Sequence, residues 1–288
     1  LVIMLPVTLL LVPYECSSTY IKGSNRAPLE IADLLPLALD DTVLLPEGPP
    51  KFTIAFDRSL VCSFPHPRRM LQAVKDRVNA LHRQGHFVVT IGGEHLVTLG
   101  VIQAYRRFFP NLSVLQLDAH ADLRNSYEDS RYSHACVMRR IREIPGLNVL
   151  QVGIRSLSAP EGEYIQKNNI PLVFSNEYHH SLDWMEQRVL PLPDPVFLTI
   201  DMDFFDPSVV PGVGTPEPHG SSWNEALRLF DFIAAKKTII GFDVMELCPS
   251  LERTISLSVA TRMILYILQT IGQKDTGVAS SHKHYPTV

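Results

Sequence analysis

Val114-Leu-Gln-Leu-Asp118-Ala-His120-Ala-Asp122 is an apolar, strand-like run that ends in three potential metal ligands at every second position. In an extended backbone, alternate side chains point to the same side, so Asp118, His120 and Asp122 can converge on one point. No packing requirement accounts for three such residues at this place. The stretch therefore predicts a buried strand that carries a metal site at its carboxyl end.

A second stretch follows the same pattern. Val196-Phe-Leu-Thr-Ile200 is apolar, and Asp201 and Asp203 follow it two residues apart. Charged residues that merely end strands would explain one such cluster, but they explain two poorly. Together the two strands supply five potential ligands, which favours a metal site shared between them.

The composition limits the kind of protein that can carry this site. The chain has 288 residues, of which 45% are hydrophobic and 19% charged, as in one large globular α/β domain. A net charge of −4 and the lack of a dense Lys/Arg tract argue against nucleic acid or an acidic membrane surface as a partner, and are compatible with a small cationic substrate. The four cysteines are widely spaced without a Cys-x-x-Cys pair, so neither structural zinc nor a redox dithiol is indicated.

The apolar opening of the chain, Leu1 to Val12, could be mistaken for a signal peptide. It has no basic leader, is interrupted by Pro6, and has no small-residue cleavage site before Pro13. We interpret it as the first core strand, which at this length cannot span a bilayer. No targeting signal is visible, so the cytoplasm is the expected location.

Strand-like and helix-like periodicities alternate along the rest of the chain. The pattern predicts strands over 52–56, 87–91, 114–117, 149–152, 172–174, 196–200 and 239–244, and helices over 28–37, 67–84, 96–107, about 133–143, 158–169, 182–189, 224–236 and 254–270. Such alternation calls for a parallel sheet covered by helices on both faces. Without an internal repeat or a long linker, we expect one domain over 1–273 and a mobile polar tail over 274–288.

Further polar residues follow the predicted strands. In open α/β sheets, sites form outside the carboxyl ends of the strands. His95 follows the strand 87–91 and Glu246 follows the strand 239–244, so four strands present polar groups at one edge. Four carboxylates and two imidazoles are too many for one ion, which indicates two divalent cations about 3.5–4 Å apart that activate a shared water for hydrolysis. Oxygen ligands with some imidazole suit manganese, with magnesium, iron, nickel and zinc left open.

Four segments resemble the signature motifs of a known family. They are Gly92-Gly-Glu-His95, Asp118-Ala-His-Ala-Asp122, Thr199-Ile-Asp-Met-Asp203-Phe-Phe-Asp-Pro207 and Pro211-Gly-Val-Gly-Thr-Pro-Glu217. In this order they look like the motifs of the ureohydrolases, the arginase and agmatinase family, over about residues 12–270. The resemblance implies a three-layer α/β/α fold with a central, mostly parallel sheet of eight strands, and hydrolysis of a guanidino group to urea and an amine. It also implies a homo-oligomer, a trimer or a hexamer.

The resemblance further implies a role for each ligand position. One manganese ion would be held by His95, Asp118, Asp122 and Asp201, and the other by Asp118, His120, Asp201 and Asp203, with Asp118 and Asp201 bridging. Asp122 would also position the metal-bound hydroxide that attacks the guanidinium carbon, where the two cations stabilise the tetrahedral intermediate.

Two further positions match family segments. Glu246, in Gly241-Phe-Asp-Val-Met-Glu246, would orient the substrate guanidinium through a bidentate contact, or would be an ordinary strand-end carboxylate. His134, in Ser133-His-Ala-Cys-Val-Met-Arg-Arg140, would pass a proton to the leaving amine, or would be a structural histidine at a helix start.

Other conspicuous residues have simpler interpretations. His179 and His180 are expected at a surface turn, because adjacent side chains point apart. Cys136 is expected to pack rather than to act as a nucleophile. The Arg139-Arg140 pair is expected to face solvent or a neighbouring subunit.

The choice of substrate depends on the loop 123–132. Arginases recognise the α-carboxylate and α-amine of arginine with this loop, whereas the segment from Ser133 resembles agmatinases, whose substrate has no carboxylate. Agmatine, cleaved to putrescine and urea, is therefore the leading substrate, and arginine, guanidinobutyrate and N-substituted agmatines stay open. The chain departs from the common family pattern at Leu96, Ala135 and His219, and none of these changes removes a ligand.

Three other functions compete with this interpretation. A deacetylase of the related fold would use a single zinc ion, and the six-ligand set argues against it. A catalytically silent homologue serving as a binding or regulatory subunit would be favoured by the loss of a ligand, yet all six are present. A structural scaffold with incidental acidic strand ends explains the motifs least well. We therefore predict an active hydrolase.

Overall fold

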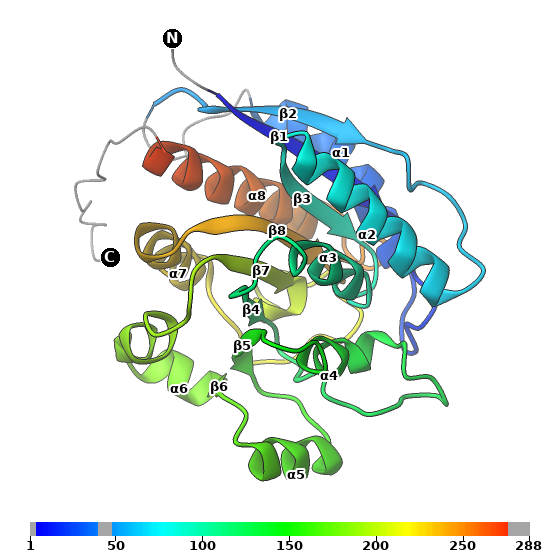
Figure 1. Cartoon of the computed structure of the whole chain (residues 1–288), viewed down its shortest axis with the longest axis vertical. Coiled ribbons are helices and arrows are strands. Elements are labelled where there is room, and N and C mark those ends of the chain that lie inside the picture. The colour runs from blue at the N-terminus through cyan, green and yellow to red at the C-terminus, as the bar shows by residue number, and fades with distance from the viewer. Residues whose placement is uncertain (1–3, 40–47, 276–288) are drawn as a thin grey trace.

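Eight strands form one sheet in the computed structural model, which describes residues 4–39 and 48–275. The strands are β1 (Leu5–Val12), β2 (Phe52–Asp57), β3 (Phe87–Gly92), β4 (Ser113–Leu117), β5 (Asn148–Ile154), β6 (Leu172–Phe174), β7 (Val196–Asp201) and β8 (Ile239–Met245). Their order is β2-β1-β3-β8-β7-β4-β5-β6, and every neighbouring pair is parallel (Figure 1). The expected parallel sheet of eight strands is confirmed.

The sheet is buried on both faces because its strands are almost continuously apolar. In β1, Val7, Leu9 and Leu11 pack into one hydrophobic cluster, while Leu10 and Val12 pack into the cluster on the opposite face. Alternate residues of a strand point to opposite faces, so a strand covered on both sides needs apolar residues at every position. The unbroken apolar runs of the sequence are explained by this arrangement.

Helices cover both faces of the sheet (Figure 1). One face carries α1 (Ala27–Leu39), α6 (Ser175–His180), α7 (Trp223–Lys236) and α8 (Thr254–Asp275), and the other carries α2 (Pro67–Arg83), α3 (Val97–Tyr105), α4 (Val137–Arg142) and α5 (Ala159–Asn168). Connections between parallel strands are right-handed, so the direction of each step along the sheet decides which face its helix covers. Steps from β2 towards β6 place helices on the second face, and steps in the reverse direction place them on the first.

The chain changes direction near the middle of the sheet. The connections leaving β8 and β7 pass to the first face, whereas those leaving β3 and β4, their outer neighbours, pass to the second. Loops that diverge to opposite faces leave a crevice at the carboxyl ends of the strands, which is where open α/β sheets bind ligands. The four central strands are those whose ends carry the predicted site residues, with the metal ligands after β3, β4 and β7 and Glu246 after β8.

Two helix predictions differ from the structure. The helix expected over 182–189 is present, but most of it is π-helical, over Met185–Val189, and the preceding α6, which ends at His180, was not predicted. The helix expected to end at Thr270 continues as α8 to Asp275, because its buried apolar stripe reaches Ile271. The tail predicted from Lys274 therefore begins inside this helix, and its remainder, 276–288, lies outside the described residues.

Helix α8 is long and apolar enough, by length and composition alone, to cross a membrane over Thr254–Lys274. However, 72% of its most apolar window is buried inside the protein, and it packs against α1 and α7. These contacts are those of a core helix.

Candidate metal centre

The predicted ligands meet at the carboxyl edge of the four central strands. His95 follows β3, Asp118 follows β4, and Asp201 is the last residue of β7. His120 and Asp122 continue from β4, and the short 3₁₀-helix Met202–Phe204 after β7 contains Asp203. Since β7 lies between β8 and β4, its two aspartates are close to the segment 118–122.

The first cluster surrounds the imidazole of His95. Its Nδ1 atom lies 3.1 Å from Asp118 Oδ2, 3.1 Å from Asp201 Oδ2 and 3.3 Å from Asp122 Oδ2. Its Nε2 atom lies 2.8 Å from the Thr199 hydroxyl, which fixes the ring so that Nδ1 faces the carboxylates. His95, Asp118 and Asp201 are arranged as ligands of one ion, with Asp122 beside them.

The second cluster shares Asp118 with the first. Asp118, His120 and Asp203 place one ligand atom each within 4.8 Å of one another. His120 Nδ1 lies 2.8 Å from Asp203 Oδ2, and Glu217 approaches the other ring nitrogen at 3.9 Å. Asp118 thus belongs to both clusters, as a bridging ligand must, whereas the expected bridging role of Asp201 has no counterpart in the second group and stays a prediction.

The side chains fit a pair of cations. His95 Nδ1 is buried and has no well-aligned hydrogen-bond partner among the described residues, although three carboxylate oxygens lie close to it. Burial, together with the charges of Asp203 and Asp122, raises the pKa of Asp118 to about 7. Cations at this point would provide a partner for the nitrogen and offset the repulsion among the carboxylates, and the mixture of oxygen and imidazole donors suits divalent ions. The two buried triads are therefore consistent with a binuclear metal site.

Asp118 is held by a chain of buried amides that the sequence analysis missed. Gln116 Nε2 donates to Asp118 Oδ2 at 2.6 Å, Gln151 Nε2 donates to Gln116 Oε1 at 2.6 Å, and Arg142 donates to Gln151 Oε1 at 3.2 Å. Both glutamines are fully buried within neighbouring strands. The sequence offered one indication of this chain of amides, which is that Gln116 and Gln151 stand inside otherwise apolar runs. A buried amide needs a hydrogen-bond partner.

A second support that the sequence analysis missed is Arg155, just beyond β5. Its guanidinium donates to the carbonyls of Asp203 at 2.6 Å, Glu217 at 3.0 Å and Pro218 at 3.0 Å. One side chain thus ties the segment that carries Asp203 to the loop that carries Glu217. Backbone acceptors have no sequence signature, so this role could not be read from the sequence.

His134 lies beside the clusters at the start of the 3₁₀-helix His134–Cys136. Its ring meets that of Tyr127 edge-on at 5.9 Å, and Tyr127 in turn lies under the guanidinium of Arg124. Burial lowers the pKa of His134, so its ring is held neutral near pH 7. Its predicted function as a proton carrier stays a prediction.

Glu246 follows β8 in a left-handed backbone conformation, with φ of 61°. Its backbone N–H donates to Gly93 O, and its Oε1 accepts the backbone N–H of His95 at 2.7 Å. These contacts join the ends of β8 and β3. Since Oε1 already accepts one hydrogen bond, a bidentate contact with a substrate would use its second lone pair together with Oε2, and this predicted contact stays a prediction.

Two interpretations of individual residues are wrong. His179 and His180 end α6 rather than forming a turn, and His179 Nδ1 lies 3.0 Å from Glu225 Oε1. Arg140 does not face solvent, because it is only 5% exposed and contacts Glu143 and Asn125. Arg139 stacks over the ring of Tyr164.

Two of the departures from the family pattern, Leu96 and His219, make packing contacts. Leu96 is fully buried in the hydrophobic cluster of the second face. His219 adopts φ of 67° and packs its ring on that of His179, at 4.4 Å between centroids. Cys136 is buried, as expected.

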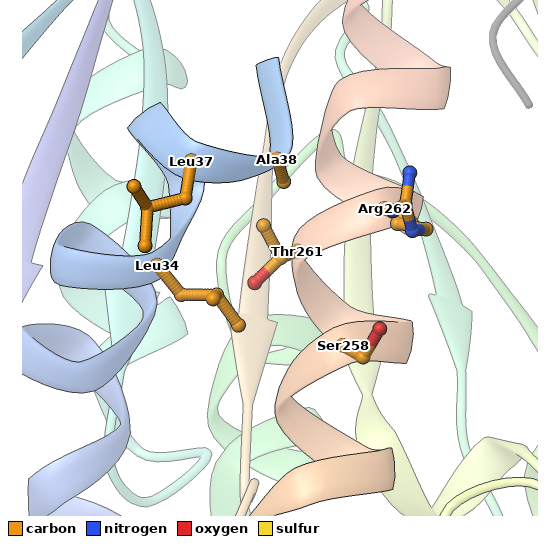
Figure 2. A pocket seen from close by; sticks show the side chains of 6 residues that line it. All are labelled: Leu34, Leu37, Ala38, Ser258, Thr261 and Arg262. Atoms are coloured by element: carbon orange, nitrogen blue, oxygen red, sulfur yellow. The ribbon is translucent and has the colours of Figure 1, made fainter. Parts of the chain in front are cut away.

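Two surface hollows do not overlap with these clusters. One, of about 120 Å³, lies between α1 and α8, and Figure 2 shows Leu34 and Thr261 turned into it. The other, of about 460 Å³, is lined by residues around α6, including Trp184. Neither contains a predicted ligand, so the metal centre is the candidate functional site.

Comparison with known proteins gives consistent results. A model of the arginase family matches residues 5–269. An N(1)-aminopropylagmatine ureohydrolase from Synechocystis sp. is 39% identical over 248 residues, covering 83% of this chain and 80% of that protein. An agmatinase from Pyrococcus horikoshii is 34% identical over 186 residues, covering 62% of this chain and 61% of that protein.

A solved structure agrees with the fold. The crystal structure of the agmatine ureohydrolase of Thermoplasma volcanium has a TM-score of 0.81 and 25% sequence identity to this chain. The match covers 96% of this chain and 93% of that one. The three-layer arrangement expected from the sequence motifs is therefore confirmed.

Proposed function

This chain belongs to the arginase family and is a ureohydrolase of the agmatinase type, and from this premise we propose that its substrate is an agmatine extended by an N1-aminopropyl group. Hydrolysis of that guanidino group would release urea and leave the triamine spermidine. The proposal replaces agmatine, the leading substrate in the sequence analysis, with one of the alternatives left open there. It retains the reaction and the site.

One observation carries the proposal. The relative named as an N(1)-aminopropylagmatine ureohydrolase matches this chain at higher identity, and over more of its length, than the agmatinase does. Two exposed carboxylates, Glu128 and Asp129, lie on the loop that packs Tyr127 against His134, and the arginines of this loop pair with other carboxylates, Arg124 with Glu161 and Arg131 with Glu143. This arrangement is compatible with a polycationic substrate. Agmatine itself has one positive charge fewer than the extended substrate.

The proposed metal ligands are the six predicted residues. His95, Asp118, Asp122 and Asp201 would hold one manganese ion, and Asp118, His120, Asp201 and Asp203 the other. When bound, two divalent cations lower the pKa of a water and concentrate positive charge beside the reacting carbon.

The chain's own residues would then direct the reaction. Glu246 would pair with the guanidinium and Asp122 would orient the attacking water, since both carboxylates border the His95 cluster. The water oxygen bonds to the guanidinium carbon, and the bond from that carbon to the alkylated nitrogen breaks. His134 would take one proton from the attacking water and return it to this nitrogen, and the second water proton would pass to the released amine. Urea and an ammonium group then leave, and the positive charge of the guanidinium is conserved.

The test measures urea release by the manganese-loaded protein with N1-aminopropylagmatine, agmatine, arginine and guanidinobutyrate in parallel. We expect kcat/KM for N1-aminopropylagmatine to exceed that for agmatine by at least about tenfold, which corresponds to about 1.4 kcal/mol of transition-state binding. Asp122→Asn is the matched control, because it keeps the shape of the side chain and should abolish urea release while the protein stays folded.

Each other outcome has a definite meaning. Equal or better activity on agmatine would overturn the extended substrate and restore the agmatinase assignment. If the protein binds two metal ions per chain but releases no urea from any of the four compounds, the result would favour an inactive homologue that serves as a binding or regulatory subunit.

A further inference from the structure

The segment that follows β1 is fastened to the site by one buried carboxylate. Glu94 is fully buried, and its Oε2 accepts the backbone N–H groups of Cys16 and Ser17, each at 2.6 Å. Its Oε1 accepts the hydroxyl of Ser17 at 2.7 Å. Because a hydroxyl has a single proton, the proton of Ser17 is committed to Glu94.

Ser17 also touches His134 at two points. Its Oγ accepts the backbone N–H of His134 at 2.8 Å and lies 3.3 Å from Nδ1 of the ring. Since the hydroxyl proton is given to Glu94, a hydrogen bond at Nδ1 requires the ring to donate. Nδ1 then carries the proton of the neutral imidazole, and Nε2 keeps its lone pair.

We propose that Ser17, held by Glu94, is a positioning residue that fixes the orientation and tautomer of His134. In this tautomer Nε2 can take the proton that the attacking water gives up and return it to the leaving nitrogen, so no proton is gained or lost over the cycle. The inference rests on the proposed function, because it assigns Ser17 a task only if His134 carries that proton.

A neighbouring hydroxyl offers the opposite arrangement. Ser133 Oγ lies 3.4 Å from the same Nδ1 atom and has no second hydrogen bond to another described residue. A proton donated by Ser133 would place the imidazole proton on Nε2 instead. Ser17 is favoured because it is closer, is anchored by Glu94, and is already bonded to the backbone of His134.

The adjacent residue provides a matched control. Ser18 belongs to the same segment, and its Oγ is buried without a hydrogen-bond partner among the residues that the structure describes. Ser18→Ala removes a hydroxyl of the same size, one residue away, that forms no hydrogen bond with Glu94 or His134, and it leaves the backbone contact of Ser18 with Glu94 in place. Any general effect of shortening a serine in this segment should appear in both variants.

The first test compares kinetics in the manganese-loaded protein. We expect Ser17→Ala to lower kcat by about tenfold while KM changes by less than about twofold, because the variant disturbs proton transfer and not binding. Ser17→Thr, which keeps the hydroxyl, should restore most of kcat, and Ser18→Ala should match the wild type. Equal kcat in Ser17→Ala and Ser18→Ala, or a loss in Ser133→Ala alone, would overturn the proposal.

The second test does not depend on activity. ¹⁵N NMR of histidine-labelled protein loaded with Mg²⁺ reports the tautomer of each neutral ring, and the His134→Asn spectrum identifies the His134 signals. We expect the Nδ1–H tautomer in the wild type and in Ser18→Ala, and a mixture of tautomers in Ser17→Ala. An Nε2–H tautomer in the wild type, or the same tautomer in all variants, would overturn the inference even if no substrate is cleaved. If the spectra are as expected but no substrate is hydrolysed, the proposed function is contradicted and the tautomer assignment of His134 stands.

Discussion

At the scale of single residues, the structure separates carboxylates that form a site from those that only end strands. Asp118 and Asp201 lie at the ends of adjacent strands and face one imidazole. Asp57 also stands at the carboxyl end of a strand, β2, but it pairs with Arg77 and accepts the backbone N–H of Ser59. The difference is the partner, since a cation from the chain already compensates Asp57 while the clustered aspartates repel one another.

Asp57 gives a pH-dependent prediction. Burial alone would raise the pKa of Asp57, but hydrogen bonds from Ser59 and Arg77 outweigh it and hold that pKa below its ordinary value. A carboxylate whose folded pKa is depressed contributes stability that is complete above the unfolded pKa of about 4 and is lost as the pH falls through the folded pKa. Asp57→Asn should therefore lower the free energy of unfolding by about 1–2 kcal/mol at pH 7, and by progressively less below about pH 4.

Denaturant unfolding at several pH values measures this effect. Asp76→Asn, an exposed position on α2, serves as the control and should change stability little at any pH. A loss in Asp57→Asn of the same size at pH 3 and pH 7 would show that its charge is not the source of the stability.

At the scale of elements, the ends of β1 and β3 approach each other too closely for a side chain. A Cβ atom on Gly93 would lie 2.3 Å from the carbonyl oxygen of Tyr14, while Glu94 N donates to that same oxygen at 2.9 Å. This contact aligns the segment of Ser17 with the loop of Glu94. The glycine is therefore required by a backbone approach, and not by an unusual dihedral angle.

Gly93→Ala should accordingly affect both stability and catalysis. Because the obstructing atom belongs to the backbone, relief requires the two segments to separate, and we expect a loss of about 1–3 kcal/mol in unfolding free energy. The displacement of Ser17 should also lower kcat. Gly162→Ala in α5 is the control, since its Cβ would meet only Leu157 at 3.4 Å and alanine favours helix by about 1 kcal/mol. Wild-type stability and kcat in Gly93→Ala would contradict the idea that this close backbone approach positions Ser17.

Elements with a clear period were predicted correctly, and contacts across the fold were not. The strand ends carrying Asp118 and Asp201 could be matched from sequence because parallel strands end at one edge of the sheet. The pair Gln116 and Gln151, and the contact of Ser17 with His134, join residues 35 and 117 positions apart, which no local pattern encodes. The helix α6 was missed because six residues are too few to establish a 3.6-residue period.

At the scale of the whole molecule, folding gathers the ligands from three separate connections onto one edge. Asp118, Asp201 and Asp203 are each at most 3% exposed, so their mutual repulsion opposes folding unless cations compensate it. The ligands are held together, despite this repulsion, by the sheet, by the amide chain behind Asp118 and by the carbonyl contacts of Arg155. Ion binding should therefore be coupled to global stability.

Metal removal tests this coupling directly. A ligand that binds only the folded state, at about 1,000 times its Kd, adds about 4 kcal/mol, so chelation should lower Tm by about 8–16 °C and added Mn²⁺ should restore it.

Asp118→Asn removes the ligand shared by both clusters and should leave less than one ion per chain, whereas His120→Asn should retain one, as counted by elemental analysis. The metal-free Asp118→Asn chain should be at least as stable as the metal-free wild type, because one buried carboxylate less reduces the repulsion. This last comparison separates a lost ligand from a damaged fold. A binuclear centre that shares Asp118 would be contradicted if Asp118→Asn still bound two ions per chain. It would also be contradicted if chelation left the Tm of the wild type unchanged.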